Sequence, residues 1–147
     1  RGKYLRAFGQ FRSYNKHEEN HNHLILSVFV RDLEFLDSME DVKPNQIQLD
    51  GFICKQPVYR MTPLGREICD ILLAVNRSYG KSDYIPCICW GRNARFAGSL
   101  EIGARIELVG RIQSREYQKR ISEFEVVKRT AYEVSVNKLE MKVPEEE

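Results

Sequence analysis

The sequence has no long apolar run and contains neither of two common catalytic motifs. No stretch approaches the roughly 18 apolar residues that a membrane-spanning helix needs, and we find no basic-then-apolar leader of the kind that directs export. There is no phosphate-binding Gly-x4-Gly-Lys-Ser/Thr loop and no Gly-x-Ser-x-Gly elbow. We therefore expect a cytoplasmic protein that is not an enzyme.

The sequence also lacks the cysteine spacing of a zinc site. Zinc-binding cysteines usually come in Cys-x2–4-Cys pairs on turns. The four cysteines here are Cys54, Cys69, Cys87 and Cys89, and the only close pair is Cys-x-Cys within an apolar stretch. We expect buried, reduced thiols, which suits a reducing cytoplasm, and no metal or other cofactor.

One polar segment offers a different possibility. His17, His21 and His23 lie close in sequence to Glu18 and Glu19. Such a cluster could bind a metal ion and hydrolyse phosphodiesters. We predict instead a solvated hairpin loop, because no second set of ligands accompanies the cluster. A metal-dependent nuclease stays as an alternative.

Positive charge is scarce overall and concentrated in the middle of the chain. The net charge is +2, yet residues 1–50 carry 7 Lys/Arg against 8 Asp/Glu, residues 51–120 carry 12 against 6, and residues 121–147 carry 4 against 7. A basic segment interleaved with aromatic residues is typical of nucleic-acid binding. Charge alone fits a solvated surface equally well.

The order of the predicted elements indicates a mainly β protein built on one barrel. We predict barrel strands over residues 46–55, 67–77, 83–90, 104–117 and 130–139, a helix over 92–100, a turn at 61–65 and a charged hairpin at 118–129. Five strands with one short helix between the third and fourth form the element order of the OB-fold barrel. We assign residues 46–140 to this domain, 37–45 to a linker and 141–147 to an acidic tail.

Residues 1–36 are predicted to form a β-hairpin, with strands over 4–14 and 24–30 and a loop over 15–23. Its strands parallel the last two strands of the barrel: Leu5–Tyr14 matches Ile106–Arg115, and Val28–Glu34 matches Val134–Glu140. We interpret the hairpin as a partial repeat of an OB-like unit. Since an isolated hairpin is marginal in water, it must pack on the barrel, on a partner chain or on residues absent from this sequence. Two unrelated hairpins of similar chemistry are the alternative.

The predicted strand 83–90 carries two aromatic residues on one face. Alternation with period two places Tyr84 and Trp90 together and a small apolar set opposite them. The small set is a good core face. The aromatic face is either a second core layer or a platform for flat groups such as nucleobases.

A second face of this kind follows from the predicted strand 104–117, where Arg111, Arg115 and Tyr117 alternate with apolar residues. Proteins that bind single strands need cations for phosphates and flat rings for bases, and arginine also stacks on bases. Further cations lie at strand ends or in loops: Arg60, Arg77, Lys81 and Arg92. Surface tyrosines over apolar area and solvated arginines are the alternative interpretation.

A series of short motifs runs in order along residues 45–140. They are Asn45-x-Ile47-x-Leu49-x-Gly51, Pro57-Val-Tyr-Arg60-x-Thr62-x-x-Gly65, Leu73-Ala-Val-Asn-Arg77, Asp83-Tyr84-Ile-Pro-Cys-Ile-Cys-Trp90-Gly91, Ala104-x-Ile106-x-Leu-Val-Gly110-Arg-Ile-Gln-Ser114-Arg-Glu-Tyr117 and Tyr132-Glu-Val134. Each motif alone is weak, but together they are specific. In this region the chain resembles the bacterial single-stranded DNA-binding protein family.

The resemblance implies an OB fold that binds single-stranded DNA without strong sequence preference, in replication, recombination or repair. It implies dimers or tetramers, and base stacking on Tyr79, Tyr84, Trp90 and Tyr117. The hairpin at residues 1–36 lies outside the usual family pattern. We therefore keep an alternative, in which the chain is an OB-fold accessory module that binds a replication protein.

Overall fold

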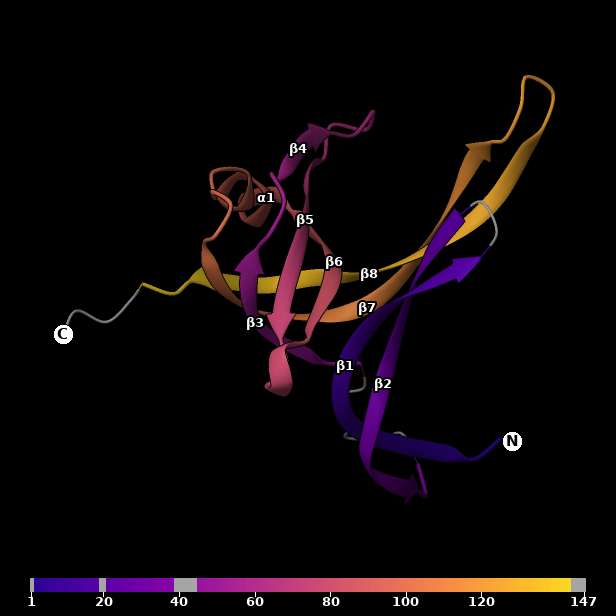
Figure 1. The fold of residues 1–147 in the computed structure, drawn as a ribbon, viewed down its shortest axis with the longest axis vertical. Coiled ribbons are helices and arrows are strands. Elements are labelled where there is room, and N and C mark those ends of the chain that lie inside the picture. The colour runs from indigo at the N-terminus through magenta and orange to yellow at the C-terminus, as the bar shows by residue number, and fades with distance from the viewer. Residues whose placement is uncertain (1, 19–20, 39–44, 144–147) are drawn as a thin grey trace.

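The computed structural model describes residues 2–18, 21–38 and 45–143, which form two sheets and one α-helix (Figure 1). The first sheet contains β1 (Tyr4–Glu18) and β2 (His21–Leu36). The second contains β3 (Ile47–Ile53), β4 (Val58–Met61), β5 (Glu67–Asn76), β6 (Ser82–Trp90), β7 (Arg105–Arg120) and β8 (Val126–Met141). A short 3-10 turn, η1 (Ser78–Gly80), precedes β6, and α1 (Gly91–Gly98) follows it. Most of the predicted linker and acidic tail lies outside the described residues.

The second sheet closes into a barrel. Its strand order is β3-β7-β8-β6-β5-β4, and β3 also pairs with β5 through Phe52–Ala74 and Ile53–Leu73. Gly51 lies where the strands meet, and a Cβ atom there would lie 2.5 Å from the carbonyl oxygen of Ala74. Five long strands, with α1 between the third and the fourth, make this an OB-fold barrel, as predicted.

Alternating apolar side chains fill the barrel. The small face of β6 is core, since Ile85, Cys87 and Cys89 are each at most 2% exposed. Their neighbours in the core include Leu73, Ile106, Leu108 and Val134. Helix α1 covers one end with the fully buried Ala94 and Ala97. Within the described residues, no helix is long and apolar enough to cross a membrane.

The sequence-based predictions missed one strand and assigned two hairpin loops that are too long. Residues 58–61 form β4, paired with β5 from Val58–Asp70 to Met61–Glu67. All of its side chains are exposed, so no burial pattern marked it in the sequence. The predicted loops at 15–23 and 118–129 are mostly strand, with β7 and β8 separated only by residues 121–125. In a two-stranded ribbon, backbone pairing continues where both faces are polar, so hydrophobic alternation does not mark its ends.

The hairpin of β1 and β2 docks on the barrel through a polar cluster of the buried Ser13 and Asp83 with the partly buried Arg77. The backbone N–H of Ser13 donates to Asp83 Oδ1 at 2.8 Å, and Tyr84 N donates to Ser13 Oγ at 2.7 Å. Arg77 donates through Nε and Nη2 to the two oxygens of Asp83, both at 2.8 Å. The Asp83 side chain is 0% exposed. A buried carboxylate needs such partners, so this cluster fixes where the hairpin sits.

The hairpin also repeats the register of β7 and β8. Gly9 faces Val30 and Gly110 faces Val136, and in each ladder the register shifts just before the glycine. These positions coincide in the sequence match between the two hairpins. A Cβ atom would lie 2.1 Å from the carbonyl oxygen of Phe29 at Gly9 and 2.3 Å from that of Ser135 at Gly110. A bulge shared at one position supports the interpretation of a repeat.

Candidate nucleic-acid interface

The register of the barrel places the predicted aromatic and arginine residues on its outer face. Directly paired residues of neighbouring strands point to the same side. Tyr84 pairs with Ala74 and Trp90 with Ile68, while Ile85 and Cys87 point into the core. On β7, Arg111 and Arg115 pair with Ser135 and Ala131, and Tyr117 follows two residues later on the same side. We call the outward surface of β5, β6, β8 and β7 the outer face.

Trp90 lies on this outer face and is neither buried in the core nor fully exposed. Its indole N–H donates to Ser135 Oγ on β8 at 3.1 Å. The guanidinium of Arg66 lies 5.9 Å from the centre of its ring. The sequence left open whether Trp90 is a core residue; the structure places it at the surface, with one ring edge tied to the sheet. Its neighbour Ile88 is 2% exposed, so the outer face is not open everywhere along β6.

Sequence reasoning missed Arg66. A tight turn sets its position: Thr62 N donates to the carbonyl oxygen of Arg66 at 2.8 Å, and Arg66 N donates to Thr62 Oγ1 at 3.0 Å. Gly65 has a φ of +80°, which glycine adopts without strain. The Thr62-x-x-Gly65 motif could have located the turn. The approach of Arg66 to Trp90 depends on tertiary structure.

Besides Arg77, two of the predicted arginines form ion pairs with carboxylates. Arg115 Nε lies 3.0 Å from Glu133 Oε1, which also accepts a hydrogen bond from Gln113 at 3.1 Å. Glu133 is 5% exposed and Arg115 is 46% exposed, so the carboxylate lies beneath an accessible guanidinium. Arg60 pairs with Asp70 at 3.2 Å. Arg111 and Arg92 are exposed, the latter on α1.

Three other predicted residues lie where β5 turns into β6. Tyr79 is fully exposed in η1, with a φ of +71°, and Lys81 is exposed beside it. Arg77 points inward to the buried Asp83 and is only 20% exposed. The structure therefore gathers Tyr84, Trp90, Arg111, Arg115 and Tyr117 on the outer face. It leaves Tyr79 and Lys81 at one end of the barrel and engages Arg77 in the hairpin contact.

The exposed part of the outer face is long enough for several bases. Tyr84 and Tyr117 are 44% and 42% exposed. Tyr84 and Trp90 are six residues apart on β6, which corresponds to about 20 Å at strand rise. Rings at that spacing leave room for bases between them.

Of the histidine cluster, the structure describes the side chains of His17 and His23 only. Among the described residues, no group of three His, Cys, Asp or Glu is close enough to hold a metal ion. The ladder pairs His23 with Lys16 and His17 with Asn22, so His17 and His23 point to opposite faces of the hairpin. Glu18, Glu19 and His21 lie outside the residues whose side chains are described.

The cysteines are free thiols, as predicted, although Cys54 is only partly buried. Burial, with a smaller contribution from Cys69, raises the pKa of Cys89 to about 12. Burial also holds the pKa of Cys87 well above its ordinary value. Thiols that stay protonated are poor nucleophiles and poor metal ligands.

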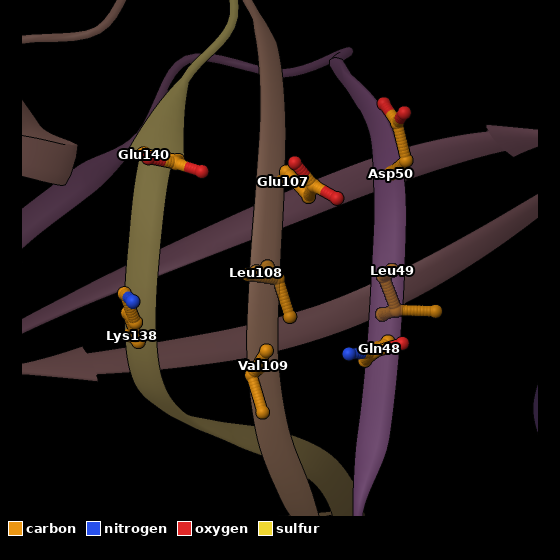
Figure 2. A pocket seen from close by; sticks show the side chains of 8 residues that line it. All are labelled: Gln48, Leu49, Asp50, Glu107, Leu108, Val109, Lys138 and Glu140. Atoms are coloured by element: carbon orange, nitrogen blue, oxygen red, sulfur yellow. The ribbon is translucent and has the colours of Figure 1, made fainter.

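An acidic hollow of about 310 Å³ lies over β3, β7 and β8. Figure 2 shows Asp50, Glu107 and Glu140 in one row across the three strands, with Lys138 in the next row. Arg105 donates to Asp50 at 3.0 and 2.8 Å, and this hydrogen bonding lowers the pKa of the Asp50 carboxyl. Lys142 lies 2.8 Å from Glu107, so two of the three carboxylates are paired with cations. The row still brings three carboxylates together, and it suits a nucleic-acid backbone less well than the outer face does.

A closed OB barrel with rings and arginines on one outer face places the chain in the class of OB-fold binding proteins. The model of the single-strand binding protein family matches residues 44–142, and the chain belongs to this family. The match covers the barrel but not β1 and β2.

The chain is similar in sequence to named relatives and similar in fold to a solved structure. The chain is 35% identical over 94 residues to Single-stranded DNA-binding protein 2 of Listeria innocua, covering 56% of this chain and 59% of that protein. It is 35% identical over 81 residues to Single-stranded DNA-binding protein B of Bacillus subtilis, covering 50% and 72%. A crystal structure of a deletion mutant of the single-stranded DNA binding protein from Thermus aquaticus matches 99% of this chain and 63% of that one, with a TM-score of 0.80 and 19% identity. That likeness confirms the fold and includes the hairpin.

Proposed function

We propose that this chain binds single-stranded DNA without strong sequence preference and without catalysis, in replication, recombination or repair. The observation that carries the proposal is the outer face, where Tyr84, Trp90 and Tyr117 share one surface with Arg111 and Arg115. Family membership and the names of the relatives support it.

Binding would combine two kinds of contact. Every base has a π-face, so stacking on Tyr84, Trp90 and Tyr117 tolerates any sequence and contributes about 1–3 kcal/mol per base. Guanidinium groups of Arg60, Arg111 and Arg115, and that of Arg92 on α1, would contact phosphates or stack on bases. Arg66 joins this set through its position over the Trp90 ring.

Three predicted residues have separate roles in this proposal. Tyr79 and Lys81 would contact a strand that continues past the Tyr84 end of the outer face. Arg77 would act indirectly, because its guanidinium is engaged with Asp83 and the hairpin. We expect Tyr79→Ala to weaken the binding of long DNA oligomers more than the binding of short ones.

Fluorescence of Trp90 tests the proposal directly, since it is the only tryptophan. Titration with oligo-dT at low salt should quench it, and added salt should weaken binding as released counterions require. Tyr84→Ala should weaken binding by about 1–3 kcal/mol, with Tyr4→Ala, at a 50% exposed position of the β1–β2 hairpin, as the matched control. Absence of quenching at low salt, with no binding in an independent gel-shift assay, would refute the proposal.

We also propose that residues 1–36 form a partial OB-like unit, joined by a linker at 37–45 to the barrel at 46–140, and that the chain assembles into a dimer or tetramer. The shared bulge and register support the first part. The exposed apolar side chains of the hairpin, among them Phe8, Phe29 and Phe35, support the second. Light scattering that gives a monomer mass at micromolar concentration would contradict the assembly.

A second candidate function follows from the same exposed hairpin. Exposed apolar strands favour contact with protein, so the chain could be an accessory module that binds a replication protein. In that case Tyr84→Ala combined with Trp90→Ala would abolish DNA binding and leave partner binding intact. For the cellular setting we propose the cytoplasm, supported by free thiols in the barrel.

A further inference from the structure

A second, larger hollow lies beside the outer face, between the long β7–β8 hairpin and the β1–β2 hairpin. Its volume is about 890 Å³. In Figure 1 one end of the β1–β2 hairpin lies against the rising arm of β7 and β8. His23 and Leu24 of β2 line one side, and residues of β7 and β8 line the other. We call this hollow the arm cleft.

The arm cleft is strongly basic. Among the described residues that line it, the one carboxylate is Glu133, which lies 3.0 Å from Arg115. The cations that line it are Arg115, Lys119, Arg120, Lys128 and Arg129. The acidic hollow over β3 has the reverse balance, with three carboxylates and one lysine. Of these two hollows, only the arm cleft attracts a polyanion.

The arm cleft continues directly from the outer face. Arg115 and Tyr117 belong to both, and Pro86 lines the cleft from β6 between Tyr84 and Trp90. The alternation of β7 carries the same side onward to Lys119, and the ladder pairs Tyr117 with Arg129. A DNA strand that leaves the outer face past Tyr117 therefore meets the cations Lys119 and Arg129 next.

We infer that the arm cleft is a second subsite for the same DNA strand, which binds its phosphates between the β7–β8 arm and the β1–β2 hairpin. This inference rests on the proposed function. It gives the hairpin a role that family membership does not assign, since the family match begins at residue 44. The β1–β2 hairpin forms the wall of the arm cleft opposite β7 and β8. Its Leu24, which is 40% exposed, would face the bound DNA.

Salt dependence tests the inference. Each phosphate contact on a single strand contributes a slope of about −0.7 to log K against log salt. Lys119→Ala combined with Arg129→Ala should reduce the slope for long oligo-dT by about 1.4 and leave the slope unchanged for an oligomer just long enough to cover the outer face. Lys55→Ala combined with Lys138→Ala removes two exposed cations elsewhere and should change neither slope. An unchanged slope for long oligo-dT in the Lys119→Ala, Arg129→Ala variant would overturn the inference. So would an equal change of slope in this variant and in the Lys55→Ala, Lys138→Ala control.

A second experiment tests whether the β1–β2 hairpin forms one side of the arm cleft. Leu24→Asp puts a carboxylate on the hairpin side of the cleft and should weaken binding of the long oligomer several-fold with no effect on the short one. Leu33→Asp, at a 55% exposed position outside the cleft lining, is the matched control. Equal affinities of the Leu24→Asp variant and the wild type for the long oligomer would remove the hairpin from the arm cleft. If the wild type binds neither oligomer, the proposed function fails; if it binds both and the variants match it, only the arm cleft fails.

Discussion

The β1–β2 and β7–β8 hairpins have the same register and the same bulge, yet they bury very different amounts of apolar surface. On β7, Ile106 and Leu108 are at most 1% exposed because the barrel closes around them. On β1, Leu5 and Phe8 are about half exposed, at 48% and 50%. The ladder of hydrogen bonds is alike in both. Burial of side chains, which needs further strands, distinguishes them, so pairing alone does not make a stable unit.

The largest expected effect tests this difference in burial. Leu73→Ala, at a fully buried barrel position, should lower the free energy of unfolding by about 2–5 kcal/mol through lost contacts and a cavity. Leu33→Ala, at a 55% exposed hairpin position, should change it by less than about 0.5 kcal/mol. Urea denaturation at low protein concentration measures both. A cost above about 1 kcal/mol for Leu33→Ala would show that something covers the hairpin in solution.

The second-largest loss of stability is expected at the polar contact between the β1–β2 hairpin and the barrel. Asp83→Ala leaves the Ser13 N–H and the Arg77 guanidinium without their buried acceptor, which should cost about 2–4 kcal/mol. Asp50→Ala removes an exposed carboxylate and is the matched control. Thermal unfolding followed by circular dichroism compares them. Equal midpoints for the two variants would mean that the polar cluster does not hold the hairpin.

Substitution of either bulge glycine, Gly9 or Gly110, should lower the free energy of unfolding, but by different amounts. Gly110→Ala forces a Cβ atom towards the carbonyl oxygen of Ser135 within the closed barrel, and we expect about 1–3 kcal/mol. Gly9→Ala meets the carbonyl oxygen of Phe29 in a hairpin that can splay more easily, so its cost should be smaller. Chemical denaturation of the two variants measures the difference. A larger cost at Gly9 would indicate that the hairpin is as constrained as the barrel.

The smallest changes in stability should come from exposed ion pairs, which ought to contribute equally on the barrel and on the β1–β2 hairpin. Asp50 pairs with Arg105 on the barrel, and Glu34 pairs with Arg6 on the hairpin. Asp50→Asn and Glu34→Gln should each cost under about 0.5 kcal/mol. The pKa of Asp50 is lowered in the folded state, so its contribution is present above the unfolded pKa near 3.8 and disappears as pH falls through the folded value. Unfolding midpoints at pH 7 and pH 2 check this; an Asp50→Asn penalty that is larger at pH 2 would contradict it.

The sequence was sufficient for the barrel because its strands are half-buried. Alternation along residues 83–90 separated Ile85 and Cys87 from Tyr84 and Trp90, and the structure confirms that the first pair is core. Strand β4 has no buried side chain, so nothing in its pattern could identify it. The same reason explains the underestimated lengths of both long hairpins.

The candidate site was predictable only in part, for a related reason. Period two is enough to place Arg111, Arg115 and Tyr117 on one side of β7. The engagement of Arg77 with Asp83 and of Arg66 with Trp90 joins residues from different elements, and no local pattern encodes such distances. The arm cleft depends on how two hairpins lie against each other, which no pattern within a single strand encodes.

The Ser13 amide proton offers a way to observe how often the two regions separate. It lies on the boundary between them and donates to a carboxylate that solvent does not reach. Its exchange with deuterated water requires the hairpin to lift away, so its exchange rate gives the free energy of that opening, separately from global unfolding. Single-stranded DNA held between the hairpin and the β7–β8 arm would slow that exchange. A single backbone hydrogen would then report on occupancy of the arm cleft.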